Sequence, residues 1–468
     1  MLNSSVSLRR RGITNNNNIH NPFQGPSSRL STISRCSLIL LFITACFNAS
    51  TKDFSFNNWR ESSSSSAASS HSNNKKGLPQ SVLQQQHDIC VVGAGLSGAV
   101  IAERYATQLN QKVLIVEKRG HIGGNCYDFL DPQANVRISK YGAHLFHTKH
   151  ERVWEYVQQF SEWTPYEHKV IGLVNNTHVP IPVNIDTVNT LFGLQLTNSQ
   201  QMDQWLAKEQ VKYDHEPSNA EEVALSRVGP RLYDLIFKPY TKKQWDRDPK
   251  ELGPEVTARI PVRNDFDGRY FSDPYQALPK RGYTAIFERM FHHPNIQVYT
   301  NVDYFDVRSQ LDCGRTYYTG PIDTYFADLG WEKLQYRSLT FERQFYKNKD
   351  FFQPAFVVNH PYESADFTRI VEYKHLPDQP KSPHTVIFVE RSSDVGEPYY
   401  PIPNQRNKDL FRKYQDMANK EPKVTFVGRL ANYKYFNMDD AILNALELFD
   451  QDTQQQQKQR QEKAKTTS

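Results

Sequence analysis

A glycine-rich turn between a short apolar run and a helical stretch constrains this chain more than any other feature. Residues 88–98 read DICVVGAGLSG, in which 89–92 predicts a buried parallel strand followed by glycines with GxGxxG spacing. Gly93 permits the tight turn, Gly95 lets the backbone approach a pyrophosphate at a helix start, and Gly98 lets that helix pack closely on the strand. The pattern predicts a doubly wound α/β domain that binds a dinucleotide, with a ligand-free glycine turn as the alternative.

The residues after this turn favour one kind of dinucleotide. A second apolar run, 112–116, ends at Glu117, which is placed to accept hydrogen bonds from the adenosine ribose. The following KRGHIGGN contains Gly123, Gly124 and Asn125. This pattern resembles a signature of FAD proteins of the glutathione-reductase-like group, in which a second glycine turn lies along the cofactor. The sequence therefore favours FAD over NAD.

The two ends of the chain differ in composition from its middle. Residues 1–86 are rich in Asn, Ser and Gln, and the stretch after about 450 reads QQQQKQRQEKAK. Such segments bury too little apolar surface to offset their ordering entropy, so both ends are expected to be disordered. The middle, 87–449, holds most of the aromatic residues and is long enough to bury a sizeable core.

One leader segment, 36–50, is an exception because it contains the apolar run LILLFITACF. Arg29 and Arg35 precede this run, which suits a signal-peptide core or a short anchor better than a full membrane span. A chance apolar patch and an incorrectly assigned start codon are the alternatives. The compartment stays open between the cytoplasm and the secretory-pathway lumen or membrane, where the sequon 175–177 would accept a glycan.

Charge and cysteine usage exclude several classes of protein. The net charge is +5 with no dominant basic block, so no nucleic-acid partner is expected. The cysteines are odd in number, widely spaced and without a CxxC pair. We therefore expect no disulfide framework, no zinc site and no other metal site. The five cysteines are Cys36, Cys46, Cys90, Cys126 and Cys313.

A series of motifs in one order is more specific than the glycine turn. The motifs are KYGAHLFHT at 140–148, YTKKQW at 240–245, RIPVRNDFDGRYFSD at 259–273, TGPID at 319–323, TRIVEYKH at 368–375, GEPYYP at 396–401 and GRLANYKY at 428–435. This series resembles the bacterial-type UDP-galactopyranose mutases over 87–449. The resemblance implies an isomerase that interconverts the pyranose and furanose forms of UDP-galactose. It also implies that N5 of reduced FAD acts as the nucleophile at the galactose anomeric carbon, with no net redox change.

The resemblance implies a substrate site rich in arginine and tyrosine. Arg259 and Arg369 match the two arginines that hold the diphosphate, which suits guanidinium because its planar fork donates two hydrogen bonds to phosphate. Arg259 is expected on a mobile loop that closes over the substrate. The other residues that match substrate positions are Asn184, Tyr240, Thr241, Trp245, Tyr270, Glu390, Tyr400 and Tyr435. Core packing of Trp245 and a structural ion pair of Glu390 are the alternatives for those two residues.

The resemblance also implies which residues contact the cofactor. His144 is expected beside the isoalloxazine ring, and it completes the catalytic set with Arg259 and Arg369. A helix predicted over 435–449 would direct its positive N-terminal end at the flavin and favour the anionic reduced form. The expected cofactor-binding residues are Gly93, Gly95, Ser97, Gly98, Glu117, Lys118, Gly124, Asn125, His144, Leu145, Val302, Arg429, Asn437 and Met438.

Asn437 is the point at which the chain departs from the family pattern, which usually has Asp there. Both residue types cap helices, so the predicted helix tolerates the change, but a negative charge is lost. A catalytically impaired UDP-sugar binder is therefore an alternative to the mutase. An FAD amine oxidase or desaturase is a second alternative, because it would share the dinucleotide motifs.

Together these features predict an α/β fold. It consists of an FAD-binding, doubly wound (Rossmann-like, glutathione-reductase-like) domain, a helical insertion and an antiparallel β-sheet domain. The expected reductant is unidentified, either NAD(P)H or a reductase, and the resemblance admits a homodimer. The expected parts are a leader at 1–86, a first FAD-binding part with the start of the sheet domain at 88–185, a helical substrate domain at 186–254, a sheet domain with an FAD-domain return at 255–424, a last FAD-binding part at 425–449 and a tail at 450–468.

Overall fold

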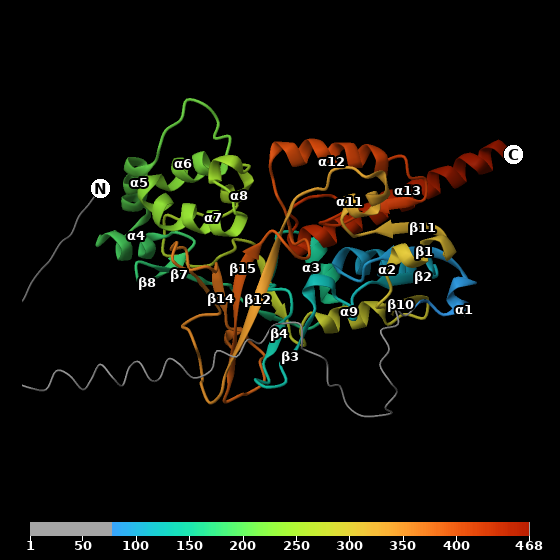
Figure 1. The fold of residues 1–468 in the computed structure, drawn as a ribbon, viewed down its shortest axis with the longest axis horizontal. Coiled ribbons are helices and arrows are strands. Elements are labelled where there is room, and N and C mark those ends of the chain that lie inside the picture. The colour runs from blue at the N-terminus through green and yellow to red at the C-terminus, as the bar shows by residue number, and fades with distance from the viewer. Residues whose placement is uncertain (1–76, 468) are drawn as a thin grey trace, which may run out of the picture. The chain divides into compact units, whose positions relative to one another are not determined.

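The computed structural model describes residues 77–467. Its first sheet has five parallel strands. The two apolar runs that predicted strands, 89–92 and 112–116, both belong to this sheet (Figure 1). The strand order is β10-β2-β1-β11-β17. The chain adds β2 and β10 on one side of β1 and then returns to add β11 and β17 on the other side, which is the arrangement of a doubly wound domain. The strands are β1 (Gln86–Val92), β2 (Val113–Glu117), β10 (Ile296–Thr300), β11 (Asp312–Tyr318) and β17 (Val424–Phe426).

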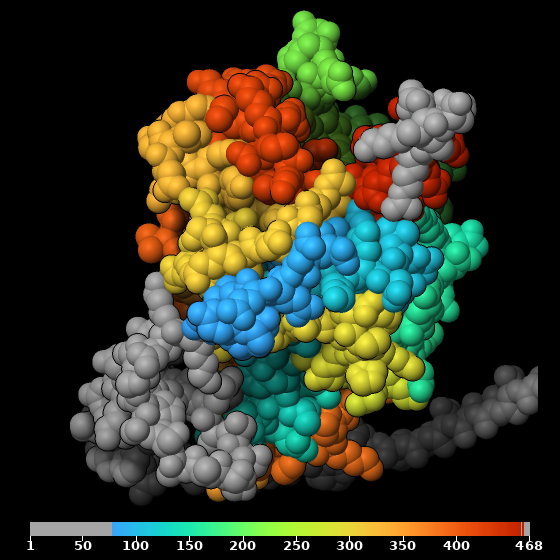
Figure 2. All heavy atoms as spheres, turned by 90° about the vertical axis from the view of Figure 1, so that its right-hand side faces the viewer, coloured from blue at the N-terminus to red at the C-terminus, as the bar shows by residue number. Residues whose placement is uncertain are grey.

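Helices cover both faces of this sheet because successive side chains of each strand point to opposite sides. Ile89 and Val91 pack into a cluster with α2 (Leu96–Leu109), α9 (Thr284–Phe291) and α13 (Met438–Thr467). The alternate residue Cys90 packs on the other side with Val82 of α1 (Gln80–Leu83) and Val307 of α10 (Tyr304–Val307). Figure 2 shows the start of the described chain, in blue, lying against yellow segments from the second half.

A second sheet has seven strands in the order β16-β12-β15-β14-β13-β7-β8. Its neighbouring strands are antiparallel, as expected, except for the one parallel pair β13–β7. The strands are β7 (Val170–Val174), β8 (Thr177–Ile181), β12 (Tyr336–Tyr346), β13 (Val357–Asn359), β14 (Arg369–Val371), β15 (Thr385–Ser393) and β16 (Tyr400–Pro401).

A group of helices follows β8 and packs its apolar side on the second sheet (Figure 1). Asn184, Asn198 and Asn219 each precede a helix, and each side chain accepts a first-turn N–H, so local capping sets three of the helix starts. The helices are α4 (Ile185–Phe192), α5 (Ser199–Glu209), α6 (Ala220–Leu232), the π-helical turn η3 (Tyr233–Phe237), α7 (Lys238–Trp245) and α8 (Glu255–Ala258).

Smaller elements join these parts. Two short sheets occur, β3-β4 and β5-β9-β6, and the second brings β9 against the His-containing strand β5. The strands are β3 (Asp128–Leu130), β4 (Arg137–Ser139), β5 (Phe146–Thr148), β6 (Trp163–Pro165) and β9 (Tyr275–Pro279), and the helices are α3 (Glu151–Gln158), α11 (Ile322–Tyr325) and α12 (Gln405–Ala418).

The ends of the described region differ from the expected disorder. Residues 77–86 contain α1 and the start of β1, and 450–467 continue α13. Asp452 in this tail is buried, accepts a hydrogen bond from Tyr317 and pairs with Arg315 at 2.8 Å. This contact with the parallel sheet explains why a Gln-rich segment begins as ordered helix. The possible signal or anchor at 36–50 lies outside the described residues, and within 77–467 no helix has the length and apolarity needed to cross a bilayer.

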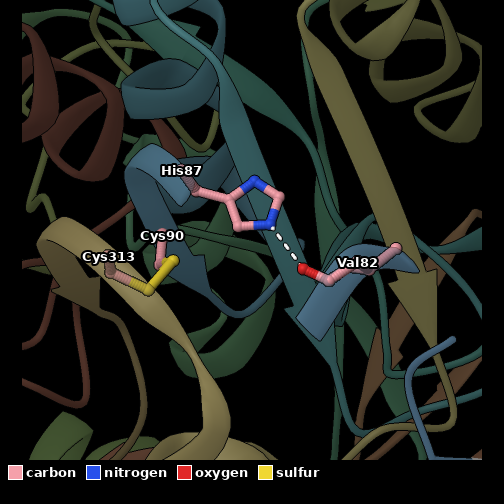
Figure 3. The surroundings of a disulfide bond; sticks show 4 residues. All are labelled: Val82, His87, Cys90 and Cys313. Atoms are coloured by element: carbon pink, nitrogen blue, oxygen red, sulfur yellow. Dashed lines mark hydrogen bonds between the residues drawn. A yellow bond between two sulfur atoms is a disulfide. The ribbon is translucent and has the colours of Figure 1, made fainter. Parts of the chain in front are cut away.

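The structure also joins two cysteines that the sequence offered no reason to pair. Cys90 of β1 and Cys313 of β11 form a disulfide (Figure 3), although 223 positions separate them in the chain. Parallel pairing of the two strands brings their Cα atoms to 5.8 Å. Beside the bridge, His87 bonds to the carbonyl of Val82. The sequence predicted no disulfide framework, and the structure corrects this prediction because it contains one disulfide bond. Cys126 is a buried free thiol.

Candidate functional site

The site is a cavity of about 240 Å³ lined by the helical group, the mixed sheet and the loops before α13. Most of the predicted substrate and flavin residues lie in its wall. From the predicted sets, the wall contains Asn125, His144, Leu145, Tyr240, Thr241, Trp245, Arg259, Tyr270, Arg369, Tyr400, Arg429, Tyr435, Asn437 and Met438.

Arg369 enters the cavity from β14 and pairs with a buried acid. Glu390 stands opposite it on β15, with 2.5 Å between Arg369 Nε and Glu390 Oε2. Glu390 is almost fully buried and is not part of the cavity wall. Its contact is with Arg369, which is the structural ion pair considered as an alternative for this residue. Burial opposes the charge of Arg369, but Glu390 and nearby tyrosines raise the pKa of the guanidinium well above its usual value.

Arg259 comes from the C-terminal end of α8 and lies over an aromatic ring. Its guanidinium carbon is 4.5 Å from the ring centroid of Tyr435, which in turn stacks on Tyr400 with 5.2 Å between centroids. Burial tends to raise the pKa of Tyr435, but the adjacent Arg259 and Arg429 lower it overall. The phenol is therefore a stronger hydrogen-bond donor than an isolated tyrosine.

These contacts give the cavity a positive charge. Arg259, Arg369 and Arg429 all line it, and among the described residues only Glu390 forms an ion pair with any of the three. Arg429 is held by the backbone, because its Nε donates to the carbonyl of Phe436 at 2.9 Å. Three guanidinium groups among aromatic walls, one of them paired with a buried carboxylate outside the wall, form a site suited to a multiply charged anion.

His144 lies in the same wall as a neutral imidazole. Its Nδ1 donates to the carbonyl of Gly142 at 2.8 Å, which leaves Nε2 as the acceptor of the neutral ring. Burial, together with Arg429 and Arg369, lowers the pKa of His144 to about 4. The ring can therefore orient a ligand at neutral pH without adding charge.

Two other predicted substrate residues have structural contacts. Asn184 is fully buried away from the cavity wall, because its side chain accepts from the N–H of Thr187 at 3.0 Å and caps α4. Its amide Nδ2 has no hydrogen-bond partner among the described residues, and the expected substrate contact stays a prediction. Trp245 combines both roles considered for it, since it lines the cavity and also packs against Leu252 and Ile402.

The glycine residues lie at the carboxyl ends of the parallel strands. A Cβ on Gly93 would lie 2.2 Å from Thr319 Oγ1, and one on Gly124 would lie 2.8 Å from Gly95 Cα, so the two predicted turns pack directly against each other. Helix α2 begins after Gly95 without a capping side chain from the described residues. Its first N–H groups are thus available to a pyrophosphate, and these residues fit a dinucleotide.

The remaining predicted cofactor residues surround these turns. The Glu117 carboxylate accepts the N–H groups of Ala94 and Arg119, each at 2.8 Å, so it stabilises the turn, and its expected contact with the ribose stays a prediction. Val302 is buried beside the end of β2, where its N–H donates to the Glu117 carbonyl at 3.0 Å. Ser97 and Gly98 are buried at the start of α2, whereas Lys118 is exposed.

The expected cap of α13 is also altered. The Asp440 carboxylate accepts the backbone N–H of Asn437 at 3.0 Å, so the acid of the first turn closes the helix start and Asn437 is exposed in the cavity wall. His150, Asp439 and Asp440 are the described residues that bring three potential metal-ligand atoms within 4.8 Å of one another. Burial and Asp440 raise the pKa of Asp439, and a helix N-terminus disfavours cations. The absence of a metal stays a prediction.

Several wall residues were not predicted as ligands. Tyr399, Gln244, Phe237, His168 and Asn359 all line the cavity. Two of them had a signal in the sequence, because Tyr399 lies inside GEPYYP and Gln244 inside YTKKQW. The other three lie outside the quoted motifs, and the packed fold brings them to the cavity.

The fold and the site together define an enzyme with a doubly wound domain that fits a dinucleotide and a cationic, tyrosine-lined cavity that suits an anion. Residues 235–435 match the family model described as UDP-galactopyranose mutase, and residues 91–160 match an NAD(P)-binding Rossmann-like domain. The chain belongs to the UDP-galactopyranose mutase family and is an isomerase. Family and domain together imply a flavin cofactor.

Three similar proteins illustrate the relationship. A probable UDP-galactopyranose mutase from Klebsiella pneumoniae is 36% identical over 78% of this chain and 94% of its own length. A dTDP-fucopyranose mutase from Escherichia coli is 34% identical over 77% of this chain and 96% of its length. A crystal structure of reduced UDP-galactopyranose mutase superimposes with a TM-score of 0.62 at 19% identity, covering 78% of this chain and 95% of that one, and shows the shared fold.

Proposed function

We propose that this protein interconverts UDP-galactopyranose and UDP-galactofuranose with FAD in its reduced form. The observation that carries the proposal is the common cavity of Arg259, Arg369 and Arg429, which come from three distant segments. A diphosphate between sugar and nucleoside carries two negative charges, and fixed guanidinium groups match it in charge and geometry. Family membership supplies the reaction class.

FAD is the flavin that the two glycine turns support. The free N–H groups at the start of α2 suit a pyrophosphate, and Glu117 suits an adenosine ribose. Reduced flavin, when bound, supplies a nucleophile for the anomeric carbon of the sugar. An unidentified reductant, either NAD(P)H or a reductase, would keep it reduced, and a homodimer remains a proposal.

The chain's own residues would bind and orient the nucleotide sugar. Arg259 and Arg369 would hold the diphosphate before and after it leaves the sugar, so that it stays available for return. Tyr435, with its lowered pKa, and Tyr400 would donate hydrogen bonds to phosphate oxygens without adding charge. Tyr240, Thr241, Trp245 and Tyr270 would form the remaining wall and exclude water from the reacting sugar.

A dTDP-linked 6-deoxy sugar is the second candidate substrate, because the dTDP-fucopyranose mutase is almost as similar to this chain as the first mutase. An amine oxidase or desaturase is disfavoured, since such enzymes do not need a cluster of arginines around their substrate. An impaired UDP-sugar binder would keep the same cavity, so only an assay separates it from the mutase.

The test incubates dithionite-reduced holoprotein with UDP-galactofuranose or with dTDP-fucofuranose and resolves the products by chromatography. Conversion of the UDP sugar by reduced protein, and not by oxidised protein, supports the proposal. Faster conversion of the dTDP sugar supports the second candidate. UDP binding without conversion of either compound would leave an inactive binder.

A further inference from the structure

Lys243 lies on the side of α7 that faces away from the cavity. The helix directs Tyr240, Thr241, Gln244 and Trp245 at the cavity, as the helical period requires for positions i, i+1, i+4 and i+5. Lys243 falls between these positions and is partly buried against another part of the chain. The lysine therefore contacts something other than the substrate.

The lysine head group is surrounded by backbone carbonyls. Its Nζ donates to the carbonyls of Tyr362 at 2.8 Å, Phe367 at 3.0 Å and Ala365 at 3.2 Å, and also to that of His360. All four belong to the segment 360–368, which connects β13 to β14. An ammonium group is the side chain best matched to several inward-facing carbonyls, because it carries three donors and no acceptor. Without it, the carbonyls of His360, Ala365 and Phe367 would lose this partner, whereas the Tyr362 carbonyl would keep the N–H of Ala365 at 3.3 Å.

This segment joins two residues of the cavity wall. Asn359 ends β13 immediately before it, and Arg369 begins β14 immediately after it. Its ends are closed by a bond from the His360 N–H to the Thr368 carbonyl, and Thr368 also donates to the Glu390 carbonyl, each at 2.9 Å. Lys243 thus connects the helix that carries Tyr240 to the strand that carries Arg369.

We propose that Lys243 is a positioning residue for the reaction, which locks α7 onto the segment 360–368 and so sets the spacing between Tyr240 and Arg369 across the substrate cavity. The inference rests on the proposed function, because it assumes that these two residues hold the substrate. The C-terminal end of α7 has a separate attachment, since Arg337 and Ser392 both donate to the Gln244 carbonyl. Loss of the lysine bonds should therefore loosen the segment without unfolding the helix.

The surroundings of Lys243 make this lock sensitive to pH. Burial lowers the pKa of Lys243 to about 8, and the facing acids Asp366 and Glu363 offset only part of this effect. Asp366 is itself paired with Arg391 of β15, and the facing His360 has its pKa lowered to about 4, so it is neutral. Above about pH 8 the amine loses a proton, and its new lone pair opposes the carbonyls. The lock should therefore hold below this pH and weaken above it.

The test compares Lys243→Met and Lys243→Arg with Lys242→Met in the FAD-loaded full chain. Lys242 is an exposed neighbour on the same helix, and its one ion pair within residues 77–467 is with Asp248 at 3.6 Å, so it is a matched control. For Lys243→Met we expect KM for the nucleotide sugar to rise about tenfold with a smaller change in kcat and unchanged FAD content. Lys242→Met should stay within about twofold of wild type. A Lys243→Met protein that is folded, FAD-loaded and normal in kcat/KM would overturn the inference.

The pH profile is a second measurement, and it covers the case in which Lys243→Met does not fold. The wild type should lose kcat/KM on an alkaline limb near pH 8, and Lys243→Arg should move this limb upward by about one unit or more because guanidinium stays charged. An identical limb in Lys243→Arg contradicts the inference. If the wild type converts neither sugar, the proposed function fails. In that case the affinity of the variants for UDP tests the positioning role of Lys243. Weaker UDP binding by Lys243→Met than by Lys242→Met supports the positioning role, and equal binding overturns it.

Discussion

Arg369 and Glu390 face each other from neighbouring strands, and 2.5 Å separates the arginine Nε from the buried carboxylate. The two residues differ in their surroundings, because Glu390 is buried in the protein whereas Arg369 reaches the cavity. One charge therefore fixes the orientation of the other at the point where an anionic ligand would bind. This geometry predicts that the pair contributes to stability and to the binding of an anion.

Replacing Glu390 by Gln should destabilise the fold. The change removes the charge that compensates Arg369 and leaves a poorer bond in a buried position, at a cost of about 1–3 kcal/mol in the free energy of unfolding. Urea denaturation at neutral pH measures it. Glu162→Gln, which removes the exposed pair with Lys280, is the control and should cost about 1 kcal/mol or less. Equal effects of the two changes would contradict the structural role of the buried pair.

The two predicted diphosphate residues should be needed for turnover and not for cofactor retention. Arg259→Ala and Arg369→Ala each remove a desolvated charge, so kcat/KM should fall about 30-fold or more. The absorbance of bound flavin should be unchanged, because neither residue belongs to the glycine turns. Arg412→Ala removes an exposed arginine of α12 and should be neutral. Near-normal turnover of both cavity variants would remove the basis of the proposed function.

The Cys90–Cys313 bridge should stabilise the fold that binds the dinucleotide. It closes a loop of 223 residues, and such a link restricts the unfolded chain, with a stabilisation of about 3–5 kcal/mol. Thermal or denaturant unfolding with and without a phosphine reductant checks this. The double variant Cys90→Ala, Cys313→Ala should be as unstable as the reduced wild type and indifferent to the reductant. A wild type that responds to reductant no more than the double variant would show that the bridge does not form.

Restoring a carboxylate at position 437 should have little effect. Asp440 already accepts the N–H of Asn437, so the start of α13 carries a negative charge there. An additional charge at an exposed helix terminus is worth about 0.3–1 kcal/mol, and turnover of Asn437→Asp should differ less than about fivefold from wild type. Steady-state kinetics of the reduced enzyme measures the effect. A much larger gain would mean that Asn437 impairs catalysis, as the alternative of a weak UDP-sugar binder assumes.

The stability of the protein should fall between pH 6.5 and pH 4. Burial lowers the pKa of His144 from 6.5 to about 4, so over this interval the unfolded chain binds a proton that the folded chain does not. Stability from this group is complete above pH 6.5 and is lost as the pH falls to about 4. Urea unfolding at several pH values should show a shallower decline for His144→Asn, which keeps a donor for the Gly142 carbonyl. Since His168 and His360 shift in the same direction, part of the decline should remain. An unchanged slope would contradict a neutral, buried His144.

Features that depend on neighbouring residues could be predicted from the sequence. The turn around Gly93 and Gly95, the buried strands beside it and the helix that follows are recorded in spacing and composition, because each depends on the conformation of a few consecutive residues. The motif series contains most residues of the cavity wall, including Arg259 and Arg369. Asn184 also stood out in the sequence. The structure shows that its side chain caps α4 through the N–H of Thr187, and its expected substrate contact stays a prediction.

Only the tertiary structure decided which distant residues meet. Cys90 and Cys313 carry no local signal of pairing, and they join because β1 and β11 are parallel neighbours. The tail after 450 has the composition of a disordered segment, yet it is helical where Asp452 reaches Tyr317 and Arg315. In the sequence, nothing distinguishes Lys243 from the other lysine of YTKKQW. Only the structure shows that the segment 360–368, which precedes Arg369, surrounds its ammonium group. In each case the stabilising contact depends on the three-dimensional path of the chain, and a local pattern of residues cannot encode that path.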